Sequence, residues 1–341
     1  MIPDYWKTDL NTIAEWANHA KKAEVRVLGK SAGGRDIWLF AYGEKEDLHP
    51  KANYNSACGA KDVTAYVDRK NKKPVILLAG AIHGQETEGT AALMNLISLL
   101  ETGKDLAGNP NQELVYWASK VRLLIIPVVN ADGRAHVKPA AMIGLTYEEF
   151  RHWGQGRWKD GSLCEWPDCK RVHPIKDAVS FLGGYFNDDG VNLMHDQMFN
   201  PMARETKLLF ELAEQEILDC SLLLHGGAND TNDLLQPQFV PLEVNQAVQE
   251  LAERCDLVAR KEGLTFKRKD LPGKECGECS PSFNLTSAMH HVTGAVSATF
   301  ESNEAIVDHP GEKLTYDEIL RSHAILFEQV CRMFVERQSK K

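Results

Sequence analysis

The stretch PVILLAGAIHGQETEGTAALMNLISLL, residues 74–100, decides the fold class. Its first part is a continuous apolar run, which is typical of a strand covered on both faces. Apolar residues then recur at helical spacing, which predicts a helix over residues 86–101. Three ionisable residues, His83, Glu86 and Glu88, stand where the strand ends and the helix begins. A buried strand that leads into a packed helix indicates an α/β protein, and the ionisable residues indicate a site at this junction.

Similar apolar runs follow along the chain. We expect further strands in AEVRVLG, IWLFAYG, VRLLIIPVVN, CSLLLHG and AVSATFES, and further helices over residues 203–217, 242–262 and 315–337. Continuous apolar strands that alternate with helices suit a mixed or mainly parallel sheet. The sequence therefore predicts one α/β domain over residues 1–341, with helices packed on both faces of the sheet.

Residues 134–188 interrupt this alternation, because little of the segment is periodic. An irregular segment of this length in a compact domain is usually a functional loop or a disordered one. Trp153, Trp158 and Trp166 argue for order, since disordered segments are poor in aromatic residues. We interpret the segment as an ordered loop insertion near the site.

Composition excludes several classes of partner. The chain of 341 residues is 43% hydrophobic and 26% charged, which is typical of a soluble globular protein. With 39 basic and 48 acidic residues its net charge is −9, so we expect no general attraction to nucleic acid or to an anionic membrane. No apolar run is long enough to span a membrane. No signal peptide is visible, so we expect a cytoplasmic protein if the sequence is complete and a secreted one otherwise; no oligomeric state is predicted.

The ionisable residues of the opening stretch have the spacing of metal ligands. Ligands of open α/β sheets bind beyond the carboxyl ends of strands, and His83 follows a strand directly. Glu86 lies three residues further on, so that both side chains can reach one point. A catalytic zinc takes three protein ligands and leaves one position for water. CSLLLHGGAND supplies His225 as the third ligand, again directly after an apolar run.

A fourth ionisable residue has the same position. GAVSATFESNEA places Glu301 at the end of a predicted strand, where it can take a proton from zinc-bound water and pass it to a leaving amine. Each residue also has a purely structural interpretation. A histidine after a strand is often structural, Glu86 can be an acid favoured by the helix dipole, as we interpret Glu88, and Glu301 can be a surface acid. The shared position at strand ends favours a site.

With these residues in place, the sequence resembles the zinc carboxypeptidases of the funnel type. The resemblance runs from about residue 5 to 335 through LGKSAGGRDIWLFAYG, HGQE, IPVVNADG, GVNLMHD, LLLHGG and TFE, in that order. It implies a three-layer α/β/α sandwich around a mixed sheet of about eight strands. It also implies one Zn²⁺ bound by His83, Glu86 and His225, with Glu301 as general base and acid.

The sequence differs from the family at the residues with which the family binds the terminal carboxylate of its substrate. Met194 and His195 stand in place of the family's Asn-Arg pair, and neither offers a fork that matches a carboxylate. Asn192 stands where the family has an acid that orients the first zinc histidine, and its amide oxygen can still accept the imidazole N–H. The family's tyrosine ahead of the last glutamate is not evident, and His290 or His291 lines the pocket or donates a proton in its place, or is simply a helix residue.

Three arginines of the loop insertion are further candidates. Arg151, Arg157 and Arg171 can each bind a substrate carboxylate. Arg157, in GQGRWKDG, also resembles the family's arginine that polarises the scissile carbonyl, although Arg151 matches in another alignment. A solvated loop arginine is the alternative for all three.

The cysteines have mostly structural interpretations. Cys220, Cys255 and Cys331 lie in apolar or helical patterns and are expected to be buried. The pairs Cys164 with Cys169 and Cys276 with Cys279 suit a second metal site, disulfides or neither. Catalysis by a cysteine near His290 and His291 has no support, because nothing marks either CGEC cysteine as having a lowered pKa.

The sequence therefore predicts a zinc-dependent hydrolase of amide bonds, carboxypeptidase-like, that acts on peptides. Zinc chemistry alone does not distinguish peptides from acyl-amino acids, so an N-acyl amino acid deacylase is the alternative. A catalytically degenerate member that binds peptides is another, because the carboxylate-gripping pair is missing. The four retained site residues argue against it.

Overall fold

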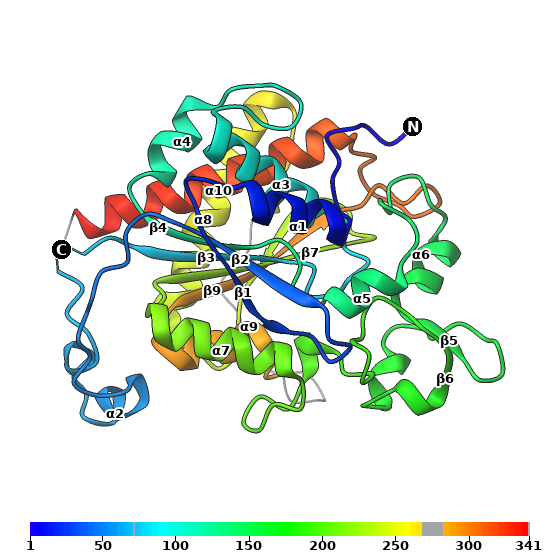
Figure 1. Ribbon diagram of the computed structural model, residues 1–341, viewed down its shortest axis with the longest axis horizontal. Coiled ribbons are helices and arrows are strands. Elements are labelled where there is room, and N and C mark those ends of the chain that lie inside the picture. The colour runs from blue at the N-terminus through cyan, green and yellow to red at the C-terminus, as the bar shows by residue number, and fades with distance from the viewer. Residues whose placement is uncertain (71, 268–281, 340–341) are drawn as a thin grey trace.

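The apolar runs of the sequence form the central strands of one sheet. The computed structural model describes residues 1–70, 72–267 and 282–339 (Figure 1). In this part of the chain seven strands form a mixed sheet in the order β1-β2-β4-β3-β7-β9-β8. They are β1 (Glu24–Lys30), β2 (Asp36–Tyr42), β3 (Val75–Gly80), β4 (Arg122–Ile126), β7 (Cys220–Gly227), β8 (Asp233–Leu235) and β9 (Val296–Asn303). All six strands expected from the sequence are present.

The centre of the sheet is parallel and its edges are antiparallel. Strands β4, β3, β7 and β9 run parallel to one another, whereas β1, β2 and β8 pair antiparallel. The short edge strand β8 was not predicted, because three residues are too few for a periodic pattern. The parallel centre brings the carboxyl ends of β3, β7 and β9 to one edge, and the predicted site residues follow or end these strands.

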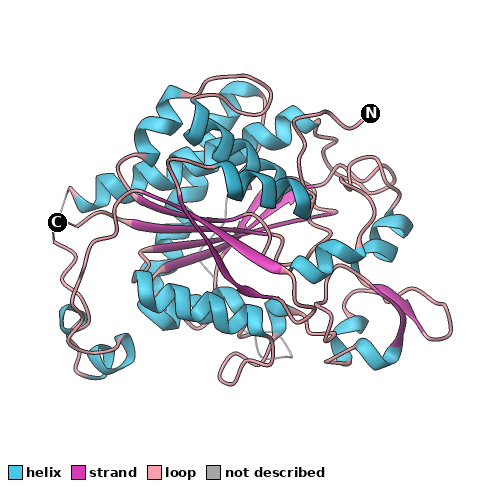
Figure 2. Ribbon diagram, viewed as in Figure 1, coloured by secondary structure: helices cyan, strands magenta, loops and turns pink. Residues whose placement is uncertain are grey.

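Helices cover both faces of the sheet, which makes three layers (Figure 2). One face carries α1 (Leu10–His19), α3 (Thr87–Thr102), α4 (Gln112–Ala118), α8 (Leu242–Ala259) and α10 (Tyr316–Gln338). The other carries α7 (Arg204–Glu216) and α9 (Leu285–Thr293). The α/β/α sandwich is confirmed, with seven strands where about eight were expected.

Strand β3 shows why the sheet needs two helical layers. Ile76 and Leu78 pack into the hydrophobic core under α3 and α10. Leu77 and Ala79 point to the other face and pack into the core under α7 and α9. Because successive side chains of a strand point to opposite faces, a continuous apolar run demands cover on both. The ring of Tyr54 in the short helix α2 (Tyr54–Gly59) packs against that of His290 in α9. None of the described helices is long and apolar enough to cross a membrane.

The insertion at residues 134–188 is ordered, as expected, but it is not featureless. It contains α6 (Tyr147–Gly154) and an antiparallel ribbon of β5 (Gly156–Trp158) and β6 (Val179–Leu182). Its first residues belong to α5 (Ala131–His136), the first helix after β4. The ribbon and the adjoining loops enclose a small apolar cluster of their own, which includes Cys164, Cys169, Ile175 and Phe186.

The three cysteines that the sequence predicted to be buried are buried. Cys220, Cys255 and Cys331 are buried in the main core, as predicted. Cys164 and Cys169 are buried free thiols. Burial raises the pKa of Cys164 to about 12 and that of Cys169 to about 11, so that neither is poised as a nucleophile. Cys276 and Cys279 lie outside the described residues.

Candidate metal centre

Two histidines and a glutamate meet where β3 and β7 end. His83 lies just beyond the end of β3, and His225 lies near the carboxyl end of the parallel neighbour β7. Glu86 is the N-cap residue of α3, but its side chain makes no capping hydrogen bond to the helix. Its carboxylate turns to the two histidines instead. The strand-end position that the sequence indicated therefore brings the three side chains together.

The three side chains are close enough to share one ion. His83 Nδ1 lies 2.7 Å from Glu86 Oε1, and His225 Nδ1 lies 2.8 Å from Glu86 Oε2. One candidate ligand atom from each residue lies within 4.8 Å of the others. His83, Glu86 and His225 are only 5%, 2% and 2% exposed. The rest of the described chain holds no comparable group of three or more such residues.

The charges of this group favour the forms that bind a metal. Burial would raise the pKa of Glu86, but His83 and His225 lower it to about 2, so that the carboxylate is ionised. Burial lowers the pKa of His83, which keeps its imidazole neutral. Burial would lower the pKa of His225, but the carboxylates of Glu86 and Glu301 together raise it. Cation binding at this position displaces any proton that His225 holds.

The donor set fits a zinc ion. Although Glu86 Oε2 is buried within 2.8 Å of an imidazole nitrogen, it accepts no well-aligned hydrogen bond from the described residues. A buried, ionised oxygen without a hydrogen bond is costly unless another group compensates it. Two imidazole nitrogens and one carboxylate oxygen are ligands that zinc prefers, and three protein ligands are typical of a catalytic site.

The ring of His83 is held from two sides. Asn192 Oδ1 lies 3.1 Å from His83 Nε2 and accepts its N–H, which leaves Nδ1 free to bind a metal. The ring of Tyr185 stacks on the imidazole at 3.8 Å between centroids, with an interplanar angle of 5°. The sequence indicated Asn192 but gave no signal for Tyr185, which lies in the aperiodic insertion.

Close backbone packing fixes the turn between His83 and Glu86. The N–H of Gly84 donates to the carbonyl of Gly184 at 2.6 Å. A Cβ atom at Gly84 would lie 2.0 Å from the Arg134 backbone nitrogen and 2.1 Å from the Gly133 carbonyl carbon. Only glycine fits at this approach, because backbone atoms cannot move aside as a flexible side chain can.

Glu301 lies beside the group on the next strand. It is paired in register with His225, and Asn229 Nδ2 lies 3.5 Å from its Oε2. The residue keeps some contact with solvent, and burial of its carboxyl group, with the charge of Glu86, raises the pKa of Glu301 to about 7. A carboxyl group with a pKa near neutrality can both take and give a proton. Asn229 was not singled out from the sequence.

A pair of buried carboxyl groups lies next to the metal centre. Glu88 is in the first turn of α3, as predicted, but it is fully buried and its carboxyl group interacts with that of Glu304. Burial, with the neighbouring Glu88, raises the pKa of Glu304 well above its ordinary value. A Cβ atom at Gly226 would lie 2.9 Å from one Glu304 oxygen and 3.0 Å from one Glu88 oxygen. The pair therefore packs against the residue that follows His225.

The remaining candidate residues have the following contacts. His195 Nε2 lies 2.9 Å from Lys170 Nζ, and burial, with the charge of Lys170, lowers the pKa of His195 to about 3. Arg151 is buried and contacts the ring and hydroxyl of Tyr147. The other contacts are Arg157 with His152, Gly161 and Glu148, Arg171 with Asp168, His290 with the Ala295 carbonyl, and His291 with the Phe239 carbonyl. The roles given to these residues in the sequence analysis stay predictions.

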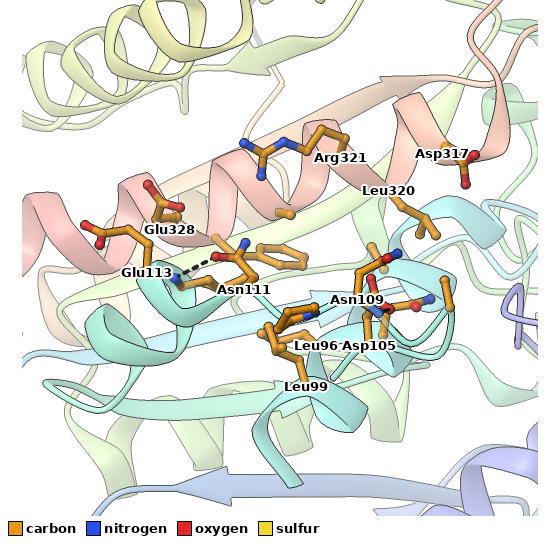
Figure 3. A pocket seen from close by; sticks show the side chains of 17 residues that line it. Leu96, Leu99, Asp105, Asn109, Asn111, Glu113, Asp317, Leu320, Arg321 and Glu328 are labelled. Carbon is orange, nitrogen blue, oxygen red and sulfur yellow. Dashed lines mark hydrogen bonds between the residues drawn. The ribbon is translucent and has the colours of Figure 1, made fainter. Parts of the chain in front are cut away.

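A cavity elsewhere in the molecule is separate from this site. It has a volume of about 470 Å³ and lies between α3, α4 and α10 (Figure 3). Its lining includes Asp105, Glu113, Asp317, Arg321 and Glu328, and none of the metal-centre residues. The acidic side chains are already engaged. Glu113 accepts from Trp117, Asp317 from Tyr5 and Asp105 from the Asn109 backbone.

Comparison with known proteins identifies the family and agrees with the fold. The family model for zinc carboxypeptidases matches residues 11–232. The match covers more than half of the chain, and the chain therefore belongs to the zinc carboxypeptidase family. A comparison with curated proteins found no match.

Solved structures of metallocarboxypeptidases have the same fold. A metallo-carboxypeptidase from Burkholderia cenocepacia is 16% identical with a TM-score of 0.60, over 96% of this chain and 69% of that chain. A metallo-carboxypeptidase from Pseudomonas aeruginosa, in complex with (2-guanidinoethylmercapto)succinic acid, is 15% identical with a TM-score of 0.58, over 96% and 68%. Bovine thrombin-activatable fibrinolysis inhibitor, in complex with tick carboxypeptidase inhibitor, is 14% identical with a TM-score of 0.56, over 98% and 100%. Family membership supports a carboxypeptidase-like metallohydrolase function.

Proposed function

We propose that this protein is a zinc-dependent hydrolase of amide bonds that acts on peptides or acyl-amino acids. One observation carries the proposal: the buried Glu86 carboxylate lies between the imidazoles of His83 and His225, with Glu301 on the adjacent strand. His83, Glu86 and His225 would hold one zinc ion. When bound, the zinc polarises a carbonyl group and makes water more acidic.

Glu301 would act as the general base and then as the general acid of the reaction. Its raised pKa supports a role in which the carboxylate first accepts a proton from water and the carboxylic acid then donates it to the leaving amine. Asn229 would orient it through the contact to Oε2. His83 would be kept in one tautomer by Asn192, and its ring would be held in place by Tyr185.

The substitution Glu301→Gln tests this function. We expect it to lower turnover by about 100- to 10,000-fold, the usual contribution of a general base or acid, while zinc stays bound. The exposed Glu243→Gln in α8 is the matched control and is expected to keep full activity. The zinc-loaded proteins are assayed on a library of peptides and N-acyl amino acids, with zinc content measured in parallel.

The same library separates the alternatives. Cleavage of N-acyl amino acids but not of peptides identifies a deacylase, for which the site chemistry is equally suited. Equal hydrolysis by wild type and Glu301→Gln contradicts the proposed role of Glu301. Binding of peptides without any hydrolysis by zinc-loaded wild type would identify a degenerate, peptide-binding member.

A further inference from the structure

The cavity between α3, α4 and α10 has the size of a small-molecule site. Its volume of about 470 Å³ falls within the range of roughly 300–1,000 Å³ that is usual for ligand pockets. Its apolar lining comes from all three helices, with Leu96 and Leu99 of α3, Leu114 of α4, and Leu320 and Phe327 of α10. The cavity is therefore a hollow with an apolar floor and not only a group of surface acids.

Acidic side chains stand at both ends of this cavity. Glu113 and Glu328 lie together at one end, and their charges interact. Asp105 and Asp317 lie toward the other end (Figure 3), where the charges of both act on Tyr5. Glu328 follows Asp317 by eleven residues, or three turns of α10, so both stand on one face of the helix with Cα atoms about 16 Å apart. The cavity thus has two acidic ends and an apolar middle.

The hydrogen bonds that these four acids accept come from neutral donors. The donors are the indole of Trp117 for Glu113, the hydroxyl of Tyr5 for Asp317, the backbone N–H of Asn109 for Asp105 and the amide of Gln329 for Glu328. A carboxylate offers about four acceptor positions, so each of the acids can take further donors. None of the four forms an ion pair within 4.0 Å with a residue that the structure describes.

The positive charge nearby is already paired with other acids. Arg321 lines the cavity, but its guanidinium donates two hydrogen bonds of 2.6 Å to Glu262. Arg332 pairs with Glu336 at 2.7 Å. Burial raises the pKa of Glu328, although the charges of both arginines lower it in part. A partly buried carboxylate of this kind gains from an added cation, because the pairing compensates its lost hydration.

The spacing of the acids favours an organic cation over a metal ion. In the described chain no three metal-binding side chains at this cavity come within 4.8 Å of one another. Acids about 16 Å apart cannot share one ion, but they can hold two positive charges of one elongated molecule. The apolar lining between them suits a chain of methylene groups.

We propose that this cavity binds a linear aliphatic polyamine. Its terminal amines lie at the two acidic ends, where each donates charge-assisted hydrogen bonds, and its methylene groups lie over the apolar floor. The site is separate from the metal centre, so the proposal does not depend on the proposed function.

The first test asks whether the site distinguishes the length of its ligand. Calorimetry at low ionic strength measures the binding of spermine and of the terminal diamines of dodecane and butane to the zinc-loaded protein. The two diamines carry the same charge, but only the longer one reaches both acidic ends. We expect it to bind at least about tenfold more tightly than the shorter one, and spermine to bind as well. Equal affinities of the two diamines would contradict the proposal.

The second test assigns the binding to the cavity. Glu113→Gln/Glu328→Gln removes the charge of one end and Asp317→Asn weakens the other. We expect each to lower the affinity for spermine and for the longer diamine at least about fivefold. Glu243→Gln/Glu253→Gln, at two exposed glutamates of α8, changes the net charge by the same amount as the first variant and is the matched control.

Three results of this second test would overturn the proposal. An equal loss in Glu113→Gln/Glu328→Gln and in the control would mean that the general negative charge of the protein attracts spermine. No loss in either would place the binding elsewhere. Binding of Mg²⁺ that Glu113→Gln/Glu328→Gln abolishes, without any binding of spermine, would assign the acids to a metal ion. If the variants fail to fold, the comparison of the two diamines on wild type still decides.

Discussion

His225 and Glu301 are register partners on the adjacent parallel strands β7 and β9. Because parallel strands end at the same edge of a sheet, this pairing places a proton-carrying carboxyl group beside a candidate zinc ligand without any help from a loop. The remaining two candidate ligands join them through β3 and the start of α3. The candidate site residues therefore lie on the central sheet and at the start of α3, and the insertion adds residues around them.

The hydrogen bond between Asn192 and His83 should tune the metal affinity. Asn192→Ala removes the acceptor that fixes the His83 tautomer, and loss of such a partner typically costs about 10- to 100-fold in metal affinity. Competition with a zinc chelator of known affinity measures the change. Asn200→Ala, at an exposed asparagine a few residues further on, is the control. Unchanged affinity in Asn192→Ala would mean that the contact at 3.1 Å does not orient the ring.

The stacking of Tyr185 on His83 should matter through the ring and not the hydroxyl. Tyr185→Phe keeps the stacked ring, whereas Tyr185→Ala removes it and leaves the imidazole free to tilt. Aromatic pairs contribute about 0.5–1.5 kcal/mol, so we expect Tyr185→Ala to weaken zinc binding by roughly 2- to 10-fold and Tyr185→Phe to leave it unchanged. Equal loss in both variants would assign the effect to the hydroxyl group.

Gly84 should tolerate no side chain. In Gly84→Ala the new Cβ would meet backbone atoms at 2.0 and 2.1 Å, so the turn between His83 and Glu86 must shift. We expect a loss of about 1–3 kcal/mol in the free energy of unfolding, with weaker zinc binding. Gly59→Ala, where a Cβ meets nothing within 4 Å, is the control for the substitution itself. Denaturant unfolding and zinc titration of both variants measure the difference, and a Gly84→Ala variant as stable as Gly59→Ala would contradict the backbone contact.

The Glu88 and Glu304 pair should make the metal-free protein less stable at alkaline pH. Burial raises the pKa of Glu304, so the folded state holds this proton more tightly than the unfolded state. Its contribution to stability is fully present below the ordinary glutamate pKa of about 4.3 and is lost as the pH rises through the folded pKa. Glu304→Gln removes this loss. We expect the variant to gain unfolding free energy relative to wild type between pH 5 and pH 8.

Denaturant unfolding curves of wild type and Glu304→Gln at pH 5 and pH 8 measure this gain in unfolding free energy. The exposed Glu253→Gln should show no such gain. A gain at pH 8 no larger than that at pH 5 would mean that Glu304 is ionised in the folded protein at both.

The main helices and strands could be predicted from the regular spacing of apolar residues. The candidate metal ligands could be predicted because they lie at or near strand ends. Residues 74–100 revealed β3, α3, His83 and Glu86 at once, because a buried strand and a packed helix leave few positions for ionisable side chains. Asn192 was found through the resemblance. Tyr185 and Lys170 were missed because the insertion around them has no regular spacing of apolar residues. Without such a spacing, the direction of a side chain cannot be predicted from the sequence.

Glu304 was missed for a different reason. It directly follows the end of β9, where no periodic pattern marks it, and the structure buries it against Glu88. Such a contact between residues far apart in sequence depends on how α3 lies over the sheet, which local patterns do not encode. Arg171, one of the three arginines singled out, contacts Asp168 and leaves most of its side chain in solvent, while the neighbouring Lys170 contacts His195.

Anomalous diffraction from crystals of the zinc-loaded protein tests the central claim most directly. The account predicts one zinc peak per chain, at about 2.0–2.2 Å from one nitrogen each of His83 and His225 and from the Glu86 carboxylate. A zinc peak bound by other residues, or none at this position in protein that contains zinc, would contradict it.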